Sequence, residues 1–355
     1  MGKVLALARG RHATAAQPDF NMAQHSKIKV AQFGLGPIGL ETLKLAAAKP
    51  WAEVLGGIDI EPAITGRDIG ELTQTSSLQG RRVFGSLDDL VAVAKPDVIF
   101  HTAVSKVKAA FPQLEPMARA GINVVSSCEE LLLPQLREPE LAAQLDAVCK
   151  QHGTRIVGTG VNPGFVMDVL PVCLTGVCRE VRAVHVQRVV NASTRRGPLQ
   201  RKIGSGWTPE EFERRFREGT AGHAGLKESL ALIAHCLGWQ ITDLLEVGKA
   251  VVADHDIRTP HVEVKKGQCC GIHQYAEAKG DGKVCLTLDI KMYLGAPNPH
   301  DACQIEGEPP LDMWIEGGVA GDAATVPSLV NAAPRLLKAP PGLLLMTDLP
   351  VPCWA

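Results

Sequence analysis

Three glycines with the spacing G-x-G-x-x-G, at Gly34, Gly36 and Gly39, are the first residues that suggest a chemical role. In dinucleotide-binding proteins the first glycine makes a tight turn, the second lets the backbone approach a pyrophosphate, and the third lets a helix pack closely on a strand. The pyrophosphate then lies at the helix N-terminus, where free N–H groups and the helix dipole favour an anion. We therefore expect cofactor contacts from Gly34, Leu35, Gly36, Pro37, Ile38 and Gly39.

An acidic residue follows the glycine motif at the distance that such a loop requires. Residues 53–58 predict a second buried strand, which ends at Asp59, about 20 residues beyond the last glycine. A carboxylate at this position bonds the ribose 2′-hydroxyl of NAD and repels the 2′-phosphate of NADP. Asp59 therefore favours NAD, whereas Arg67 would relax that preference if its loop folded back. The expected cofactor is NAD or NADP.

Two adjacent carboxylates, Glu129 and Glu130, follow the apolar segment 123–128, which predicts another strand. Side chains at the carboxyl end of a parallel strand face the ligand crevice of an open α/β sheet. A carboxylate there can accept a proton or hold a cationic amine. One of the two can instead cap the helix that follows. We expect one glutamate to be catalytic and the other structural, and the sequence does not tell which.

Further candidates lie at other strand ends. Residues 96–103 predict a buried strand that ends in Thr102 and Ala103, and Ser127 closes the strand before the glutamates. We expect all three to line the cofactor crevice. Asn162 and Pro163 follow the strand predicted at 155–160. They either position the nicotinamide ring or form an ordinary turn out of the sheet.

The second half of the chain offers His223, which precedes a helix predicted at 226–237. It is a candidate acid, base or substrate contact, with a surface or capping histidine as the alternative. Arg195 and Arg196 lie in a long polar loop, where they either bind a carboxylate or the cofactor phosphate, or form a solvated loop tip. Metal-ligand spacing is not evident among the histidines and cysteines, so no metal is expected.

The elements that position these residues alternate between apolar strands and helices up to about residue 164. This alternation predicts a Rossmann-type, doubly wound parallel sheet. From residue 179 onward, helices are followed by a run of strands, which predicts an α+β substrate domain over the cofactor crevice. We expect a flexible tail at 1–26, a dinucleotide-binding domain at 27–164, the substrate and dimerisation domain at 165–318, and a C-terminal segment at 319–355 that returns to the first domain.

Composition limits the partners of the chain. Its 355 residues carry a formal net charge of −1, and only 4% of them are aromatic, so neither a nucleic-acid nor a membrane partner is expected. No apolar run has the length of a membrane span. The ten cysteines contain no C-x-x-C pair, which suits free thiols in a reducing cytoplasm.

Together these motifs resemble the 2,4-diaminopentanoate dehydrogenases and the native amine dehydrogenases, which share the dihydrodipicolinate-reductase-like architecture. The resemblance extends over most of the chain, from Lys29 to Pro350. The stretches that carry it are Gly34–Gly39, Ser127–Leu131, Gly160–Phe165, Arg195–Gly204, Gly222–Leu226 and Asn331–Arg335. The His-His-x-x-Lys signature of true dihydrodipicolinate reductases is absent, which argues against that reaction.

The resemblance implies reversible oxidative deamination of a small amine or diamine by NAD(P), or reductive amination of a ketone or aldehyde with ammonia. It implies that Glu129 or Glu130 holds and deprotonates the amine, that Asn331 contacts the cofactor, and that the chain forms a homodimer. Two alternatives remain: an ammonia-independent reductase of oxo acids or imines, and a cofactor-binding regulator without catalysis. Ammonia-dependent oxidation of NADH distinguishes the three.

Overall fold

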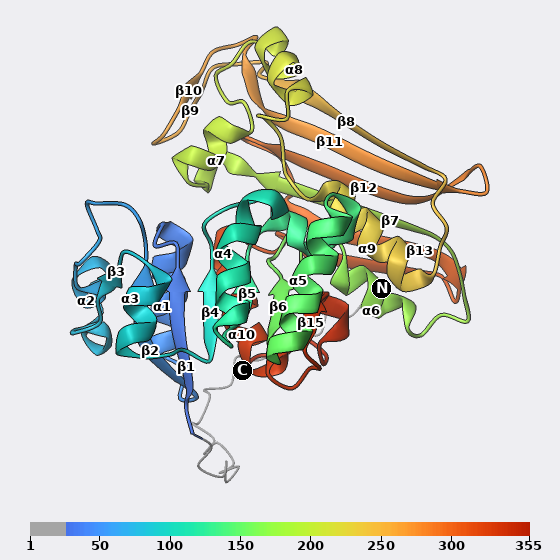
Figure 1. Ribbon diagram of the computed structural model, residues 1–355. Coiled ribbons are helices and arrows are strands. Elements are labelled where there is room, and N and C mark those ends of the chain that lie inside the picture. The colour runs from blue at the N-terminus through green and yellow to red at the C-terminus, as the bar shows by residue number, and fades with distance from the viewer. Residues whose placement is uncertain (1–25) are drawn as a thin grey trace, which may run out of the picture.

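The computed structural model describes residues 26–355, which form two sheets and the helices that cover them. A seven-stranded parallel sheet contains most of the first half, and a six-stranded mixed sheet contains most of the second half (Figure 1). The chain crosses to the second sheet after residue 175 and returns to the first near residue 321.

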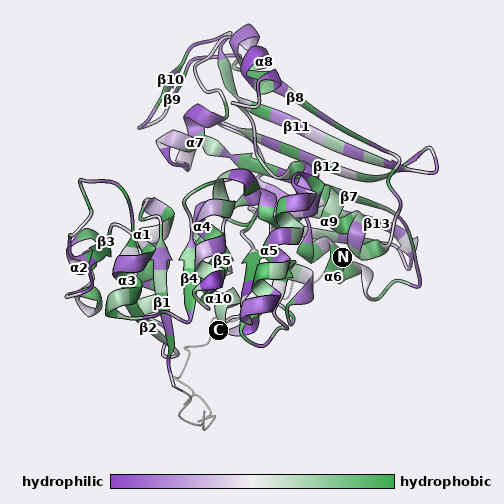
Figure 2. Ribbon diagram, viewed as in Figure 1, coloured by the Kyte–Doolittle hydropathy of each residue, from purple (hydrophilic) through white to green (hydrophobic). Residues whose placement is uncertain are grey.

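The first sheet has the strand order β15-β6-β5-β4-β1-β2-β3, and all of its pairings are parallel. Because helices cover both faces, the central strands β4 and β5 are buried at every position and do not alternate between buried and exposed residues (Figure 2). The strands are β1 (Ile28–Phe33), β2 (Ala52–Ile58), β3 (Val83–Phe84), β4 (Val98–His101), β5 (Asn123–Ser126), β6 (Arg155–Gly158) and β15 (Gly342–Leu344).

Two layers of helices bury this sheet. One core joins the sheet to α1 (Pro37–Ala47) and α10 (Gly321–Leu336), and the other joins it to α3 (Leu87–Val93), α4 (Val107–Arg119) and α5 (Pro139–His152). A short helix, α2 (Ile69–Thr73), follows β2. Helix α10 continues through two internal prolines, and β15 then pairs with β6, so the C-terminal segment completes the first sheet.

The second sheet has the order β14-β13-β7-β12-β11-β8, in which only β7 and β12 pair in parallel. One face packs on α6 (Val169–Thr175), α8 (Pro209–Arg217) and α9 (Leu226–Leu237). The other strands are β7 (Glu180–Asn191), β8 (Asp243–Val252), β11 (Cys269–Gly280), β12 (Lys283–Tyr293), β13 (His300–Glu308) and β14 (Leu311–Glu316), with a separate ribbon of β9 (Ile257–Arg258) and β10 (Glu263–Val264).

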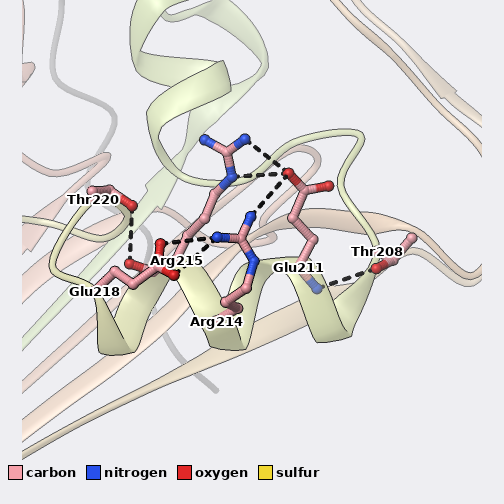
Figure 3. A network of polar contacts seen from close by, with 6 residues as sticks. All are labelled: Thr208, Glu211, Arg214, Arg215, Glu218 and Thr220. Atoms are coloured by element: carbon pink, nitrogen blue, oxygen red, sulfur yellow. Dashed lines mark hydrogen bonds and ion pairs between the residues drawn. The ribbon is translucent and has the colours of Figure 1, made fainter.

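Helix α8 shows how local sequence determines a boundary. The Thr208 hydroxyl accepts a hydrogen bond from the backbone N–H of Glu211, and Pro209 is the first helical residue, a combination typical of helix N-termini. On the exposed side, Arg214 and Arg215 pair with acidic residues one turn away (Figure 3). These pairs contribute a few tenths of a kcal/mol each, about 0.3–0.5.

The structure confirms the predicted fold class and corrects several details. The polar loop after β7 contains a short helix, α7 (Gly197–Lys202), which the sequence analysis missed, as it missed β14 and β15. Segment 321–336 is helical on both sides of Pro327 and Pro334. Among the helices of residues 26–355, none combines the length and apolar character of a membrane span.

Candidate active site

The glycine loop between β1 and α1 has the geometry of a phosphate cradle. Gly34 has φ +86°, and a side chain there would meet the Ala103 backbone at 3.2 Å. A Cβ on Gly39 would lie 2.0 Å from the Gly34 carbonyl oxygen, so this glycine permits the loop and helix to close on each other. A Cβ on Gly36 would meet nothing within 4 Å. The middle glycine therefore borders open space, where a pyrophosphate has room.

The neighbouring strand ends hold this loop in place. The buried Gln32 amide donates to the Gly34 carbonyl at 3.0 Å and to the Thr102 hydroxyl at 2.8 Å. Thr102 Oγ1 in turn donates to the Gly34 carbonyl at 2.9 Å. The Thr102 side chain therefore holds the glycine loop from the end of β4.

Asp59 lies against the same loop from the end of β2. Its carboxylate accepts the backbone N–H of Leu35 at 2.6 Å and that of Glu61 at 2.9 Å. These two bonds fix the carboxylate beside the glycine loop, where a ribose of a bound dinucleotide would lie. Arg67 is exposed, and its backbone N–H bonds the Ile64 carbonyl.

The end of β5 separates the two glutamates into different environments. The Glu130 carboxylate accepts the backbone N–H of Val107, the first residue of α4, at 2.8 Å. Glu130 therefore caps a helix. Burial raises the pKa of the Glu129 carboxyl above its usual range, while a hydrogen bond with the Ser105 side chain and the positive charge of Lys202 oppose that shift. Glu129 is thus the carboxylate that remains available for chemistry.

A buried chain of hydrogen bonds fixes the turn that carries Glu129. Gln113 Oε1 lies 2.7 Å from His101 Nε2, and His101 Nδ1 lies 2.8 Å from the Ser126 hydroxyl. Because the amide oxygen can only accept, Nε2 carries the ring proton and Nδ1 accepts from Ser126. Ser126 Oγ also accepts the backbone N–H of Cys128 at 3.1 Å. Burial lowers the pKa of the His101 imidazole, which keeps the ring neutral.

The loop after β6 presents an unused amide. Both side-chain polar atoms of Asn162 are buried without a partner in the described part of the chain. The loop is held by Asp168, whose carboxylate accepts the Gly164 N–H at 2.8 Å and the Ser229 hydroxyl at 2.7 Å. A free amide donor and acceptor at the carboxyl end of a parallel strand suit the carboxamide of a nicotinamide.

His223 faces this region from the second half of the chain. Gln274 on β11 clamps its backbone, because the Gln274 amide oxygen accepts the His223 N–H at 2.8 Å and the amide nitrogen donates to the His223 carbonyl at 2.9 Å. Burial lowers the pKa of the imidazole to about 3, helped by the positive charges of Lys202 and Arg188. The ring is therefore neutral at physiological pH. Its Nε2 is buried without a protein partner among residues 26–355.

Three further candidates lie on helix α10 or contact it. Arg195 and Arg196 both pair with Asp322 in the first turn of α10, each at 3.0 Å. Asp322 therefore pairs with both guanidinium groups, of which that of Arg195 is largely buried and that of Arg196 remains exposed. Asn331 lies in the middle of α10, accepts the backbone N–H of Ala355 at 3.3 Å, and lines a pocket together with Gly160.

The structure thus brings most of the predicted residues to one edge of the first sheet. The carboxyl ends of β1, β2, β4, β5 and β6 supply the glycine loop, Asp59, Thr102 with Ala103, Ser127 with Glu129, and Asn162 with Pro163. Sequence reasoning missed Lys202, whose charge acts on both Glu129 and His223. The only signal for it in the sequence is its position in the basic stretch 195–202.

A family model and two relatives of known activity indicate the same family for this chain. A family model for the C-terminal domain of 2,4-diaminopentanoate dehydrogenase matches residues 165–354. The chain is 32% identical over 338 residues to a 2,4-diaminopentanoate dehydrogenase of Acetoanaerobium sticklandii, with 92% of this chain and 94% of the relative covered. It is 24% identical over 354 residues to an amine dehydrogenase of Streptomyces virginiae, with 91% and 96% covered.

A solved structure shows the same fold. The amine dehydrogenase from Mycobacterium smegmatis superposes with a TM-score of 0.81 at 23% sequence identity, over 93% of this chain and 98% of that chain. The match therefore includes both sheets and the helices that cover them. The family model covers more than half of the chain, and the first relative aligns along nearly its whole length. The chain belongs to the 2,4-diaminopentanoate dehydrogenase family of oxidoreductases.

Proposed function

We propose that this chain is an NAD(P)-dependent amine dehydrogenase that interconverts a small amine with a carbonyl compound and ammonia. The observation that carries the proposal is the partly buried Glu129 carboxylate at the edge of the sheet where the nicotinamide of a bound cofactor would lie, with the neutral His223 ring hydrogen-bonded to the Asn162 backbone after the neighbouring strand. The activities named for the two curated relatives support it.

The residues present fit a dinucleotide. The space beside Gly36 would take the pyrophosphate, Asp59 the adenosine ribose, and the unpartnered amide of Asn162 the carboxamide. A bound nicotinamide supplies or accepts the hydride. The protein's contribution is to orient the substrate, to exclude water and to hold the charges that develop.

Glu129 is suited to the charge of the reaction. Oxidation of the amine carbon produces a cationic iminium, which a nearby carboxylate stabilises. Water then adds to the iminium carbon, the carbon–nitrogen bond breaks, and ammonia leaves. Glu129 would accept the proton that is released when the ammonium form of the substrate or the attacking water is deprotonated. His223 Nε2, neutral and unpartnered, would hydrogen-bond the substrate nitrogen or the carbinol oxygen.

The charges around His223 favour a substrate that carries a carboxylate. Arg188 is paired with Asp301 at 2.7 Å and Arg195 with Asp322, whereas Lys202 makes no ion pair within residues 26–355. Lys202 is therefore free to bind an anionic group at the far end of an amine held by Glu129. This arrangement agrees with the substrate in the name of the Acetoanaerobium relative.

The test is an assay of NADH and NADPH oxidation with a panel of small ketones, aldehydes and 4-oxo acids, with and without ammonium. We expect turnover that requires ammonium and a product amine detectable by mass spectrometry. Turnover without ammonium would instead favour the oxo-acid or imine reductase alternative. If NADH binds but no carbonyl compound is turned over, the result would favour the alternative of a cofactor-binding regulator without catalysis.

Asp59 should set the cofactor preference. Replacing it in Asp59→Ser removes the charge that repels a 2′-phosphate, so we expect kcat/KM for NADP to rise at least 10-fold relative to NAD, a change of about 1.4 kcal/mol. Steady-state kinetics with both cofactors measures this ratio. An unchanged ratio would mean that the ribose lies away from Asp59.

Lys202 should determine the pH at which kcat/KM falls on the acid side of its pH profile. Because its positive charge lowers the pKa of Glu129, the Lys202→Met substitution is expected to move the acid limb of kcat/KM to higher pH. The profile is best measured with an amine that lacks a carboxylate, so that substrate binding is not changed at the same time. Arg201→Met, one residue earlier on α7, is the matched control and should leave the limb in place.

We also propose that the chain works in the cytoplasm as a homodimer. All ten cysteines are free in the structure, which suits a reducing compartment. The open face of the second sheet carries Trp314, which is 60% exposed and stacks on His300 at a ring separation of 3.8 Å. If this face joins two copies, Trp314→Arg should yield a monomer in sedimentation velocity while the unchanged chain sediments as a dimer.

A further inference from the structure

The pocket that Asn331 and Gly160 line lies between the end of β6 and helix α10, and neither glutamate is among its lining residues. Its volume is about 280 Å³. Residues after β6, residues of α10 and the segment 352–354 form its walls. We call it the Arg335 pocket; the lining residues that matter here are Thr159, Phe165, Pro327, Arg335, Met346 and Trp354.

Arg335 brings a positive charge to this pocket without a counter-charge. The residue is only 6% exposed, and its Nε donates to the Pro350 carbonyl at 2.8 Å. Its Nη2 is buried and has no partner among residues 26–355, where no acidic side chain pairs with it or lines the pocket. Burial lowers the pKa of the guanidinium. An unpaired buried charge costs several kcal/mol, so a guanidinium held in this way favours an anion.

A second unpartnered group points to the same conclusion. Thr159, which follows β6, is 5% exposed, and its hydroxyl has no partner in the described part of the chain. Two polar groups from different elements therefore line one cavity with their hydrogen-bonding capacity unused. A planar carboxylate with two acceptor oxygens can bond a guanidinium and a hydroxyl at once.

The remaining walls of the pocket are mostly apolar. Phe165, Pro327, Met346 and Trp354 present hydrocarbon surface to it, which a bare inorganic ion would leave uncovered. We propose that the Arg335 pocket binds a small organic carboxylate, with its charged end on Arg335 and Thr159 and its short apolar body against Phe165 and Trp354.

The site lies close to the proposed cofactor loop, because Thr159 is only three residues before Asn162. A bound carboxylate would contact that loop, α10 and segment 352–354 together. It is therefore a site for an effector and not for the amine, which would lie at Glu129 and Lys202. An effector that orders the loop would raise NADH affinity, and by linkage NADH would raise the affinity of the effector.

The test uses pentanoate as the probe and pentanamide as its uncharged isostere, titrated by calorimetry into the full-length Lys202→Met chain saturated with NADH, so that the proposed substrate site does not take up the probe. We expect one pentanoate per chain and at least 10-fold weaker binding of pentanamide. Arg335→Met, which keeps the length of the side chain but removes the charge, should weaken pentanoate binding at least 10-fold. Thr159→Val, which removes only the hydroxyl, should weaken it several-fold.

A control variant separates this site from exposed cations. Arg119→Met, made in the same background, alters an exposed arginine paired with Glu115 and should leave pentanoate binding unchanged. Equal binding of pentanoate and pentanamide, absence of pentanoate binding in the Lys202→Met background, or undiminished binding in Arg335→Met would overturn the proposal. If Arg335→Met fails to fold, the Thr159→Val variant and the comparison of pentanoate with pentanamide still test the proposal. None of these binding measurements depends on amine turnover.

Discussion

Glu129→Gln is expected to lower kcat for amine oxidation by about 10²–10⁴-fold, the range that removal of a positioned proton acceptor produces. Glutamine keeps the shape of the side chain but can neither take up the proton nor balance the charge of an iminium. NADH affinity, followed by fluorescence titration, should stay within about two-fold, since Glu129 is not part of the glycine loop. The residual activity should also lose the acid limb of the pH profile, because the group that titrates has been removed.

Glu130→Gln is the matched control for this experiment. The glutamine oxygen can still accept the Val107 N–H at the start of α4, although the favourable interaction of a negative charge with the helix terminus is lost. We expect a loss of stability of about 0.3–1 kcal/mol, seen in thermal unfolding, and kcat within a few-fold of the unchanged chain. The reverse pattern, with Glu130 essential and Glu129 dispensable, would contradict the assignment.

The sign of the pH effect at Glu129 follows from its surroundings. Because burial raises its pKa, the carboxyl takes up a proton at a higher pH than an exposed glutamate would. The deprotonated form is the active one for amine oxidation, so kcat/KM should fall as pH drops through this raised pKa. His223 should add no inflexion between pH 5 and 8, since its pKa is about 3. His223→Asn should therefore leave the position of the acid limb unchanged.

The parts of the site that the sequence predicted well are those set by local chain geometry. The glycine spacing determines a turn within six residues, and the small and polar residues at strand ends follow directly from the parallel sheet. The start of α8 at Thr208 and Pro209 is local in the same way, because a helix cap needs only the residues next to it. The fold class followed from the alternation of these elements along the chain.

The parts that the sequence left open depend on contacts between distant segments. Which glutamate caps a helix depends on where the N-terminus of α4 lies, and Val107 is 23 residues before Glu130. Gln274 holds His223 from a strand 51 residues away, and Asp322 neutralises Arg196 across 126 residues. No pattern of spacing in one sequence identifies such partners. The charge of Lys202 matters only because folding brings α7 near Glu129.

The glycine loop provides a prediction in which two similar substitutions have opposite effects on stability. Gly36 has φ −65° and ψ −177°, which alanine adopts readily, and its Cβ would meet nothing within 4 Å. Gly36→Ala should therefore fold normally. Its free energy of unfolding should be unchanged or raised by about 0.4–1 kcal/mol, because alanine lowers the conformational entropy of the unfolded chain. The added methyl group would occupy the space that a pyrophosphate needs. We expect NADH to bind at least 100-fold more weakly, a loss of about 2.7 kcal/mol.

Gly39→Ala places its methyl group inside the protein. The Cβ would lie 2.0 Å from the Gly34 carbonyl oxygen, and that oxygen is held by Gln32 and Thr102, so the loop cannot retreat without breaking these bonds. We expect a loss of about 1–3 kcal/mol in unfolding free energy, measured by calorimetry, together with weaker NADH binding. Both substitutions thus impair the cofactor site, but only Gly39→Ala lowers the melting temperature. Normal NADH affinity in Gly36→Ala would place the pyrophosphate away from this loop, because a ligand on the cradle cannot share that space with a methyl group.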